Sequence, residues 1–302
     1  MGKEEPTATL ALGVDVGAVS VAAVLLGPDV FRKAWLPHEG DAAGALNRLL
    51  ASWPLARVAR VGATGSRVAS LLPYLQPLDE IVCAVEGVRR SCPEARGVLL
   101  VGGERCAFVE LDEQFRYVSH TTNGSCAAGT GLFLEQLASS LGLSLTDFSQ
   151  AAARSTSPPP DIATRCAVFA RTDVVHLLQT GHSIDDVCKG VFRSLARGIG
   201  NELLRGQTLP QPTVLVGGVG RVEPAVAALE DHLGMSFAKL KEPEVVGAYG
   251  AALLAAPATW QTPAETGDRP LVAARPPLAG RAGGKGTPRV QLVDEMQVFT
   301  YG

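Results

Sequence analysis

The sequence predicts an α/β protein with two domains and a separate C-terminal tail. Its 302 residues are 46% hydrophobic and include 33 glycines, so the chain can form two moderate cores. Apolar strand patterns alternate with amphipathic helical patterns, and three strands run into glycine turns, at Gly17, Gly102-Gly103 and Gly217-Gly218. From Pro257 onward the composition changes to Pro, Gly, Ala and Arg, which indicates a flexible linker and tail over 257–302.

The first half of the chain predicts a strand hairpin followed by alternating helices and strands. Residues 10–26 are rich in valine and leucine on both sides of a tight turn at Gly17. Gly40 to Leu50 is helical in pattern, and Val58 to Ser66 indicates a strand that ends in a glycine turn. Leu78 to Arg90 predicts an amphipathic helix with an apolar stripe of Ile81, Val82, Val85 and Val88.

The second half repeats the arrangement of strand, paired glycines and hairpin. The expected strands are Gly97 to Gly103, Cys106 to Leu111, Phe115 to Thr121 and Pro212 to Gly220. The expected helices are Gly131 to Leu141, Leu145 to Arg154 (capped by Ser144 or Thr146), Ser183 to about Leu204, a helix through Leu229, and a helix of small residues within 242–254. Ser155 to Pro160 indicates a proline-rich loop, and Val290 to Tyr301 is compatible with a short strand. The expected domains are 8–95, completed by the helix near 244–256, then 96–243.

Charge and terminal composition exclude several function classes. The 27 basic and 30 acidic residues give a net charge of −3, and neither sign forms a long run, so no nucleic-acid or membrane surface is expected. Met1 to Pro6 contains no apolar signal segment, and no apolar stretch approaches the length of a membrane span. The expectation is a cytoplasmic protein.

Asp15 is a candidate magnesium-assisting residue. It lies inside an otherwise apolar hairpin, two residues before Gly17. A buried carboxylate costs desolvation energy unless a cation meets it, and a hydrated magnesium ion beside a phosphate chain is the usual one. A structural alternative is that Asp15 caps the turn.

Six cysteines are spread along the chain and never form a CxxC pair, so a zinc ribbon or self-contained ferredoxin site is not expected. Cys126 follows a polar, glycine-containing turn and precedes the helix expected from Gly131. A helix N-terminus lowers the pKa of a thiol, which makes Cys126 a candidate nucleophile or metal ligand; the alternative is a buried thiol that only packs. Cys83 and Cys188 fall within helical patterns and are expected to be packing residues. Two chains that meet at a symmetry axis could each supply two cysteines to one cluster.

The three glycine turns indicate a phosphate-binding function. Glycine allows backbone amides to approach a polyphosphate closely, and ligands of this kind bind at strand ends in open sheets. One such turn is weak support, because glycine turns are common. Three of them together with Asp15 are more specific. The chain contains no Walker loop, and Gly218-Val219-Gly220 lacks the third glycine of a dinucleotide motif.

The chain resembles the BadF/BadG/BcrA/BcrD-type ATPases, which activate 2-hydroxyacyl-CoA dehydratases and are related to the ATP-binding subunits of benzoyl-CoA reductase. The resemblance covers about Leu10 to Leu254, and it is closest to the activase segment of long fused activases. The motifs that carry it are Asn123 to Gly131, Arg165 to Ala170 with Asp173, Gly217 to Val219, and Gly247 to Leu253.

The resemblance implies an actin/sugar kinase/Hsp70-like fold of two ribonuclease H-like subdomains and a homodimer that binds one 4Fe–4S cluster through Cys126 and Cys166 of each subunit. It also implies ATP and Mg²⁺ as cofactors. A ferredoxin or flavodoxin-like protein would donate the electron, and an acyl-CoA dehydratase or reductase component would receive it. The implied nucleotide contacts are Gly17, Ser20, Gly102, Gly103, Gly129, Gly131, Gly217, Gly218 and Gly247.

Both phosphate loops depart from the family pattern. After Gly17 the only hydroxyl residue is Ser20, where the family has hydroxyl residues and a lysine. Leu100 stands where the family has an aspartate, and Glu104 is a candidate replacement, although a solvated turn glutamate is the alternative. Loss of a carboxylate that orients magnesium or water is expected to slow hydrolysis or abolish it. The alternative functions are therefore a non-hydrolysing iron–sulfur or nucleotide-binding subunit, and a small-molecule kinase, which leaves Cys126 and Cys166 unexplained.

Overall fold

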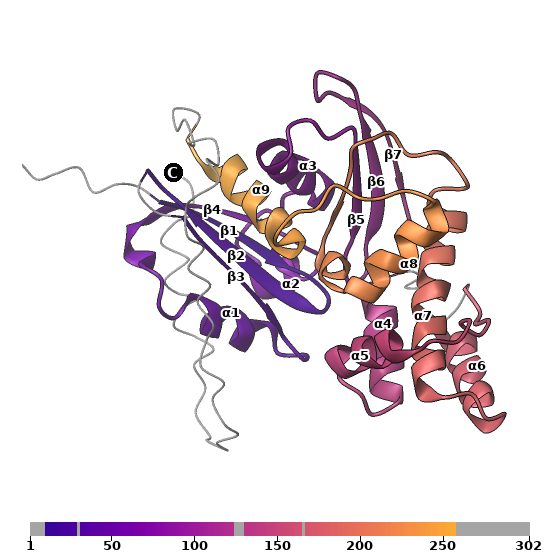
Figure 1. The fold of residues 1–302 in the computed structure, drawn as a ribbon. Coiled ribbons are helices and arrows are strands. Elements are labelled where there is room, and N and C mark those ends of the chain that lie inside the picture. Colours follow the sequence, from indigo (N-terminus) through magenta and orange to yellow (C-terminus); the bar gives the residue numbers. More distant parts are fainter. Residues whose placement is uncertain (1–9, 29–30, 124–129, 165–166, 258–302) are drawn as a thin grey trace, which may run out of the picture. The chain divides into compact units, whose positions relative to one another are not determined.

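The computed structural model describes residues 10–28, 31–123, 130–164 and 167–257, which form two structural units. We call the described residues up to Ser91 together with those from Val245 the first lobe, and Cys92–Glu244 the second lobe. Each lobe contains a four-stranded sheet, in the orders β3-β2-β1-β4 and β7-β6-β5-β8 (Figure 1). Both sheets consist of an antiparallel three-strand meander whose first strand also pairs in parallel with a later strand. None of the helices in these ranges is long and apolar enough to span a membrane.

The first sheet is apolar on both faces because helices cover both. Its strands are β1 (Leu10–Val16), β2 (Ser20–Leu26), β3 (Phe31–Pro37) and β4 (Val58–Thr64). Along β2, alternate residues point to opposite sides, as the strand period of two requires. Val21, Ala23 and Leu25 pack with α1 (Ala42–Leu50), whereas Ala22, Val24 and Leu26 pack with α9 (Val246–Ala255).

The other helices of the first lobe are α2 (Val68–Leu71) and α3 (Glu80–Ser91). The helix predicted over 78–90 is therefore present, but its predicted stripe is partly wrong. Val82 is 52% exposed, and the buried residues of α3 are Cys83, Ala84, Gly87 and Val88. Small residues form this face because α3 packs closely against α9: a Cβ on Gly87 would lie 2.7 Å from Val246 Cγ1. Because this buried face consists mainly of small residues, the spacing of large apolar residues does not reveal it.

The small residues of α9 bring its backbone close to the sheet. A Cβ on Gly13 of β1 would collide with the carbonyl oxygen of Ala248 and lie 2.7 Å from the Cβ of Ala252. A Cβ on Gly62 of β4 would likewise collide with the carbonyl oxygen of Ala251. Glycine in both strands therefore sets the distance between sheet and helix.

The second sheet consists of β5 (Gly97–Val101), β6 (Cys106–Leu111), β7 (Tyr117–Thr122) and β8 (Thr213–Val216). The helices of this lobe are α4 (Gly131–Ser140), α5 (Leu145–Arg154), α6 (Ala167–Gln179), α7 (Ile184–Gly198) and α8 (Glu223–Leu233). Ser144 and Ser183 cap α5 and α7 through their side chains. Of the two caps predicted for α5, Ser144 rather than Thr146 is thus confirmed. The helix after Ser183 continues past α7 as a π-helical turn, Ile199–Leu203.

The sequence did not indicate α6. Ala170 and Val174 are buried, but Phe169 is 66% and Val175 48% exposed. Apolar residues on both sides of the helix leave no clear period of 3.6 residues, which is the main sequence signal for a surface helix.

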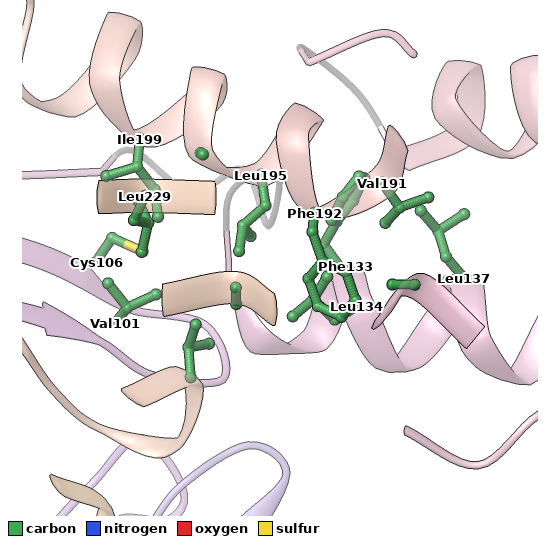
Figure 2. Close-up of a cluster of buried hydrophobic side chains, with 14 of the residues drawn as sticks. Val101, Cys106, Phe133, Leu134, Leu137, Val191, Phe192, Leu195, Ile199 and Leu229 are labelled. Atoms are coloured by element: carbon green, nitrogen blue, oxygen red, sulfur yellow. The ribbon is translucent and has the colours of Figure 1, made fainter. Parts of the chain in front are cut away.

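The core of the second lobe combines residues of its sheet with residues of helices α4 to α8. Figure 2 shows Val191, Phe192 and Leu195 on the side of α7 that faces Phe133 and Leu134 of α4. Phe192 is 1% exposed, and its ring lies 5.4 Å from that of Phe148 of α5 in an edge-to-face arrangement. This ring therefore joins three helices of the lobe.

Phe192→Ala is expected to destabilise the second lobe by about 3–5 kcal/mol, because it leaves a cavity and removes the aromatic pair. Urea unfolding monitored by circular dichroism measures the effect. Phe169→Ala is the matched control in the same lobe, since that ring is exposed, and it should change the free energy of unfolding by less than about 0.5 kcal/mol. Equal effects of the two substitutions would contradict the description of this core.

Candidate functional site

The two lobes contain the same glycine turn at the tip of their first hairpins. In the first lobe, the Gly17 N–H donates to the Ser20 carbonyl oxygen at 2.9 Å. In the second lobe, the Gly102 N–H donates to the Arg105 carbonyl oxygen at 2.8 Å. We call residues 17–20 and 102–105 the first and second phosphate turns. The arrangement of strand, glycine turn and hairpin that the sequence repeats is therefore also repeated in the structure.

A second glycine follows the parallel strand in each lobe, and both have left-handed backbone angles. Gly65 after β4 has φ +104°, and Gly217 after β8 has φ +95°. A Cβ on Gly65 would collide with the Val16 carbonyl oxygen, and one on Gly217 would lie 2.5 Å from the Val101 carbonyl oxygen. Gly65 is thus a fourth junction between a strand and a glycine turn. The sequence predicts the strand and the turn at this position, but only the other three junctions were expected to bind phosphate.

Asp15 lies beside these turns in the first lobe, and two glycines enclose its carboxylate. A Cβ on Gly65 would be 2.5 Å from Asp15 Oδ1, and a Cβ on Gly247 would be 2.5 Å from Oδ2. The predicted residue Gly247 thus makes room for a carboxylate. Among the described residues, no hydrogen bond or ion pair to the Asp15 carboxylate is formed.

Burial raises the pKa of Asp15 from 3.8 to about 7, and the nearby negative charge of Glu80 acts in the same direction. Glu80 is the first residue of α3, and the sequence offered no signal for its role. Two carboxylates close together, one without a protein cation as partner, suit a hard divalent cation that prefers oxygen ligands. The side chains of this lobe therefore fit the Mg²⁺ site expected at Asp15.

His38 holds the first phosphate turn in place. It follows β3 directly, it is 9% exposed, and its backbone N–H donates to the Val19 carbonyl oxygen at 3.0 Å. The Gly40 N–H donates to Nδ1 at 3.0 Å, so the neutral ring carries its proton on Nε2, which lies 3.3 Å from the Gly17 carbonyl oxygen. The imidazole thus fixes the direction of the Gly17 carbonyl group. This contact was not predicted.

In the second lobe, the N-terminus of α4 is bonded to the second phosphate turn. The Gly131 N–H donates to the Gly102 carbonyl oxygen and the Leu132 N–H to that of Gly103, both at 2.8 Å. Two of the four N-terminal amides of α4 are therefore already occupied. Gly131, predicted as a nucleotide contact, uses its amide to bind the turn.

Four of the cysteines are buried and described: Cys83, Cys92, Cys106 and Cys188. Burial raises the thiol pKa of Cys92 to about 11 and that of the other three to about 12. Thiols of this kind are poor metal ligands, because a ligand sulfur must be deprotonated. Cys83 and Cys188 lie at 0% exposure in cores, which confirms the packing role predicted for them.

Cys126, Cys166 and Gly129 lie outside the described residues. Three basic residues of α7, spaced four apart, bind the segment 155–161 that precedes Cys166. Lys189 donates to the carbonyl oxygens of Ser155 and Ser157, Arg193 donates to that of Pro159, and Arg197 pairs with Asp161. Asp173 of α6 accepts from the Ala163 N–H at 2.8 Å. The chain that precedes Cys166 is thus anchored, as far as Ala163, to α6 and α7.

The structure groups the predicted residues lobe by lobe. Asp15, Gly17, Ser20 and Gly247 belong to the first lobe, and Gly102, Gly103, Gly131, Gly217 and Gly218 to the second. Gly217 lies against the second turn, since its Cβ would be 3.3 Å from the Gly102 nitrogen, whereas a Cβ on Gly218 would meet nothing within 4 Å. Glu104 is half-buried, and its carbonyl oxygen accepts from Asn123 Nδ2. A group of three or more potential metal-binding side chains does not occur within the described ranges.

Comparison with known proteins relates these features to a family. Residues 51–255 match the BadF/BadG/BcrA/BcrD ATPase family. The chain is 30% identical over 251 residues to the activator of lactoyl-CoA dehydratase from Anaerotignum propionicum, covering 81% of this chain and 96% of that protein. It is 28% identical to the (R)-2-hydroxyglutaryl-CoA dehydratase activating ATPase from Acidaminococcus fermentans, covering 81% and 96% of the two chains. The activator of the 2-hydroxyisocaproyl-CoA dehydratase from Clostridium difficile, solved with bound ADPNP, superposes with a TM-score of 0.72 at 26% identity, covering 82% of this chain and 94% of that one.

Proposed function

Because the chain belongs to the BadF/BadG/BcrA/BcrD ATPase family, we propose that it is an ATP-dependent activator that transfers an electron to an acyl-CoA dehydratase or reductase component. The match over residues 51–255 carries this proposal, since a relative named as the activator of lactoyl-CoA dehydratase shares 96% of its length with the chain. The electron would come from a ferredoxin or flavodoxin-like donor, and the activator would work as a homodimer.

The nucleotide part of the proposal is supported by the duplicated turns. A relative of similar fold binds ADPNP, and both lobes of this chain present a glycine turn with a left-handed glycine beside it. Backbone amides at such turns can bind phosphate oxygens without a side-chain donor. This property suits a chain in which Ser20 is the only hydroxyl residue of the first turn.

The Mg²⁺ part is supported by the carboxylates of the first lobe. Asp15 would assist the cation, and the nearby Glu80 would contribute negative charge. A bound Mg²⁺ would neutralise charge on the phosphates and favour the ionised form of Asp15. In its absence, burial keeps the pKa of Asp15 raised to about 7.

The cluster part assigns Cys126 and Cys166 of each subunit as ligands of one 4Fe–4S cluster. Such a cluster supplies one-electron chemistry when bound. The support is the high thiol pKa of the other four cysteines together with the anchored chain that precedes position 166. The carboxylate of Asp173 would hold the chain that precedes Cys166.

Cys126→Ser and Cys166→Ser are each expected to lower the iron and sulfide content of the anaerobically purified dimer to a small fraction of the wild-type value. Iron and sulfide determination with the visible absorption spectrum measures this. Cys92→Ala is the control, because that thiol is buried, and it should leave the iron content unchanged. Unchanged iron in both serine variants would contradict the cluster assignment, and wild-type dimer without iron or sulfide would rule out the electron-transfer role.

A second candidate function is a non-hydrolysing nucleotide-binding or iron–sulfur subunit. The observation that favours it is Leu100 on β5, which occupies the position of a family aspartate. The neighbouring Glu104 binds Asn123 through its backbone. Sustained magnesium-dependent ATP turnover by cluster-loaded protein would exclude this second function.

A further inference from the structure

Asn123 makes an unusual set of hydrogen bonds with the second phosphate turn. It follows β7 directly, and its backbone N–H donates to the Cys106 carbonyl oxygen at 2.9 Å. Its side-chain Oδ1 accepts from the Cys106 N–H at 2.8 Å, and its Nδ2 donates to the Glu104 carbonyl oxygen at 3.0 Å. The side-chain amide therefore bonds to the turn as an additional stretch of backbone would.

These bonds fix the direction of consecutive peptide planes. The carbonyl groups of Gly102 and Gly103 point to the first turn of α4, and that of Glu104 points to Asn123. In a trans peptide the next N–H points the opposite way from the carbonyl group. The amides of Gly103, Glu104 and Arg105 therefore point away from α4 and from Asn123. Successive backbone amides that point to one side of a turn can bind an anion.

We infer that Asn123 is a positioning residue that orients the second phosphate turn for nucleotide phosphates and couples nucleotide binding to the first turn of α4. This inference rests on the proposed function, because it takes the turn as a nucleotide contact. Asn123, Gly131 and Leu132 all bond to the turn. A phosphate that tightens the turn would thus also tighten its bonds to the first turn of α4, and the coupling must be reciprocal.

The first lobe provides a contrast. His38 also holds its turn, through the Gly17 carbonyl group, but it belongs to the first lobe, and its ring bonds within that lobe, to Gly17 and Gly40. Substitution of His38 is therefore expected to weaken nucleotide binding without changing the response of residues 130–134 at saturating nucleotide. This difference separates an effect on coupling from an effect on affinity.

The test uses the full-length protein with MgADPNP, calorimetry for the dissociation constant, and hydrogen exchange with mass spectrometry for residues 130–134. In wild type, saturating MgADPNP should slow exchange in this peptide at least about 5-fold, the lower range of allosteric coupling. In Asn123→Ala, the dissociation constant should rise about 10-fold through the loss of two hydrogen bonds, and the slowing at saturation should be lost. Ser119→Ala, which removes an exposed side-chain bond on β7, should behave as wild type.

Asn123→Asp covers the case in which the alanine variant does not fold, because it keeps the acceptor for Cys106 and loses only the donor to Glu104. Hydrogen exchange in residues 184–198 of α7 shows, independently of nucleotide binding, whether each variant is folded. Wild-type slowing in a folded Asn123 variant overturns the inference. Wild type that binds MgADPNP without a change at residues 130–134 also overturns it and leaves the proposed function intact. Wild type that binds no nucleotide overturns both.

Discussion

Asp15→Asn is expected to lower magnesium-dependent ATP hydrolysis by about 100-fold or more and, at the same time, to stabilise the nucleotide-free protein at pH 8. The loss of activity follows because the variant removes the charge expected to assist the cation, an effect comparable to the loss of a preorganised transition-state contact. The decrease should fall on kcat more than on KM.

The stabilisation follows from the raised pKa of Asp15. Between pH 4 and pH 7 the folded state binds a proton at Asp15 that the unfolded chain has released, so this residue makes the protein less stable as the pH rises through that range. Three pKa units correspond to at most about 4 kcal/mol, and partial exposure reduces the value. The asparagine variant should match wild type near pH 4 and exceed it by about 2–3 kcal/mol above pH 7.

Urea unfolding in EDTA at pH 4, 5.5 and 8 measures this difference. Glu39→Gln is the control, because it removes an exposed carboxylate from the same lobe and should leave the pH dependence unchanged. A stability difference between Asp15→Asn and wild type that does not vary with pH would contradict the burial of this carboxylate. Unchanged ATP hydrolysis would contradict its proposed role at the cation.

Gly13→Val is expected to prevent native packing of the first lobe, and Gly13→Ala to destabilise it by about 3 kcal/mol. Any side chain at this buried position of β1 collides with the backbone of α9 at Ala248 and with the Cβ of Ala252. The sheet and helix must then separate, which also moves Gly247 away from Asp15. A loss of magnesium-dependent nucleotide binding should accompany the loss of stability.

Tryptophan fluorescence during urea unfolding can follow the first lobe, because Trp35 packs beside the α9 cluster and Trp53 lies in the core next to α1. Gly218→Ala is the matched control for folding, since a Cβ there meets nothing within 4 Å. Wild-type stability of Gly13→Ala would show that the strand and helix tolerate a larger separation.

The family and the fold were predicted from the sequence, and both predictions are confirmed. The family match covers residues 51–255, and the fold is the actin/sugar kinase/Hsp70-like one. Both hairpins and most helices were predictable, because valine-rich strands, turn glycines and serine caps act within a few residues of one another. The exceptions were β3 and α2, which were not predicted, and α6 and the buried face of α3, where small or evenly distributed apolar residues give a weak periodic signal.

The sequence by itself determined which residues form the two glycine turns, which cysteines lie within helices, and that Asp15 needs a special environment. The tertiary structure alone decided that Glu80 lies close to Asp15, that Gly65 and Gly247 enclose its carboxylate, and that Asn123 binds the second turn. The physical reason is the distance along the chain over which each interaction acts. Hairpins and caps depend on local backbone preferences, whereas a carboxylate environment or a side-chain bond to a distant turn depends on how separate elements pack.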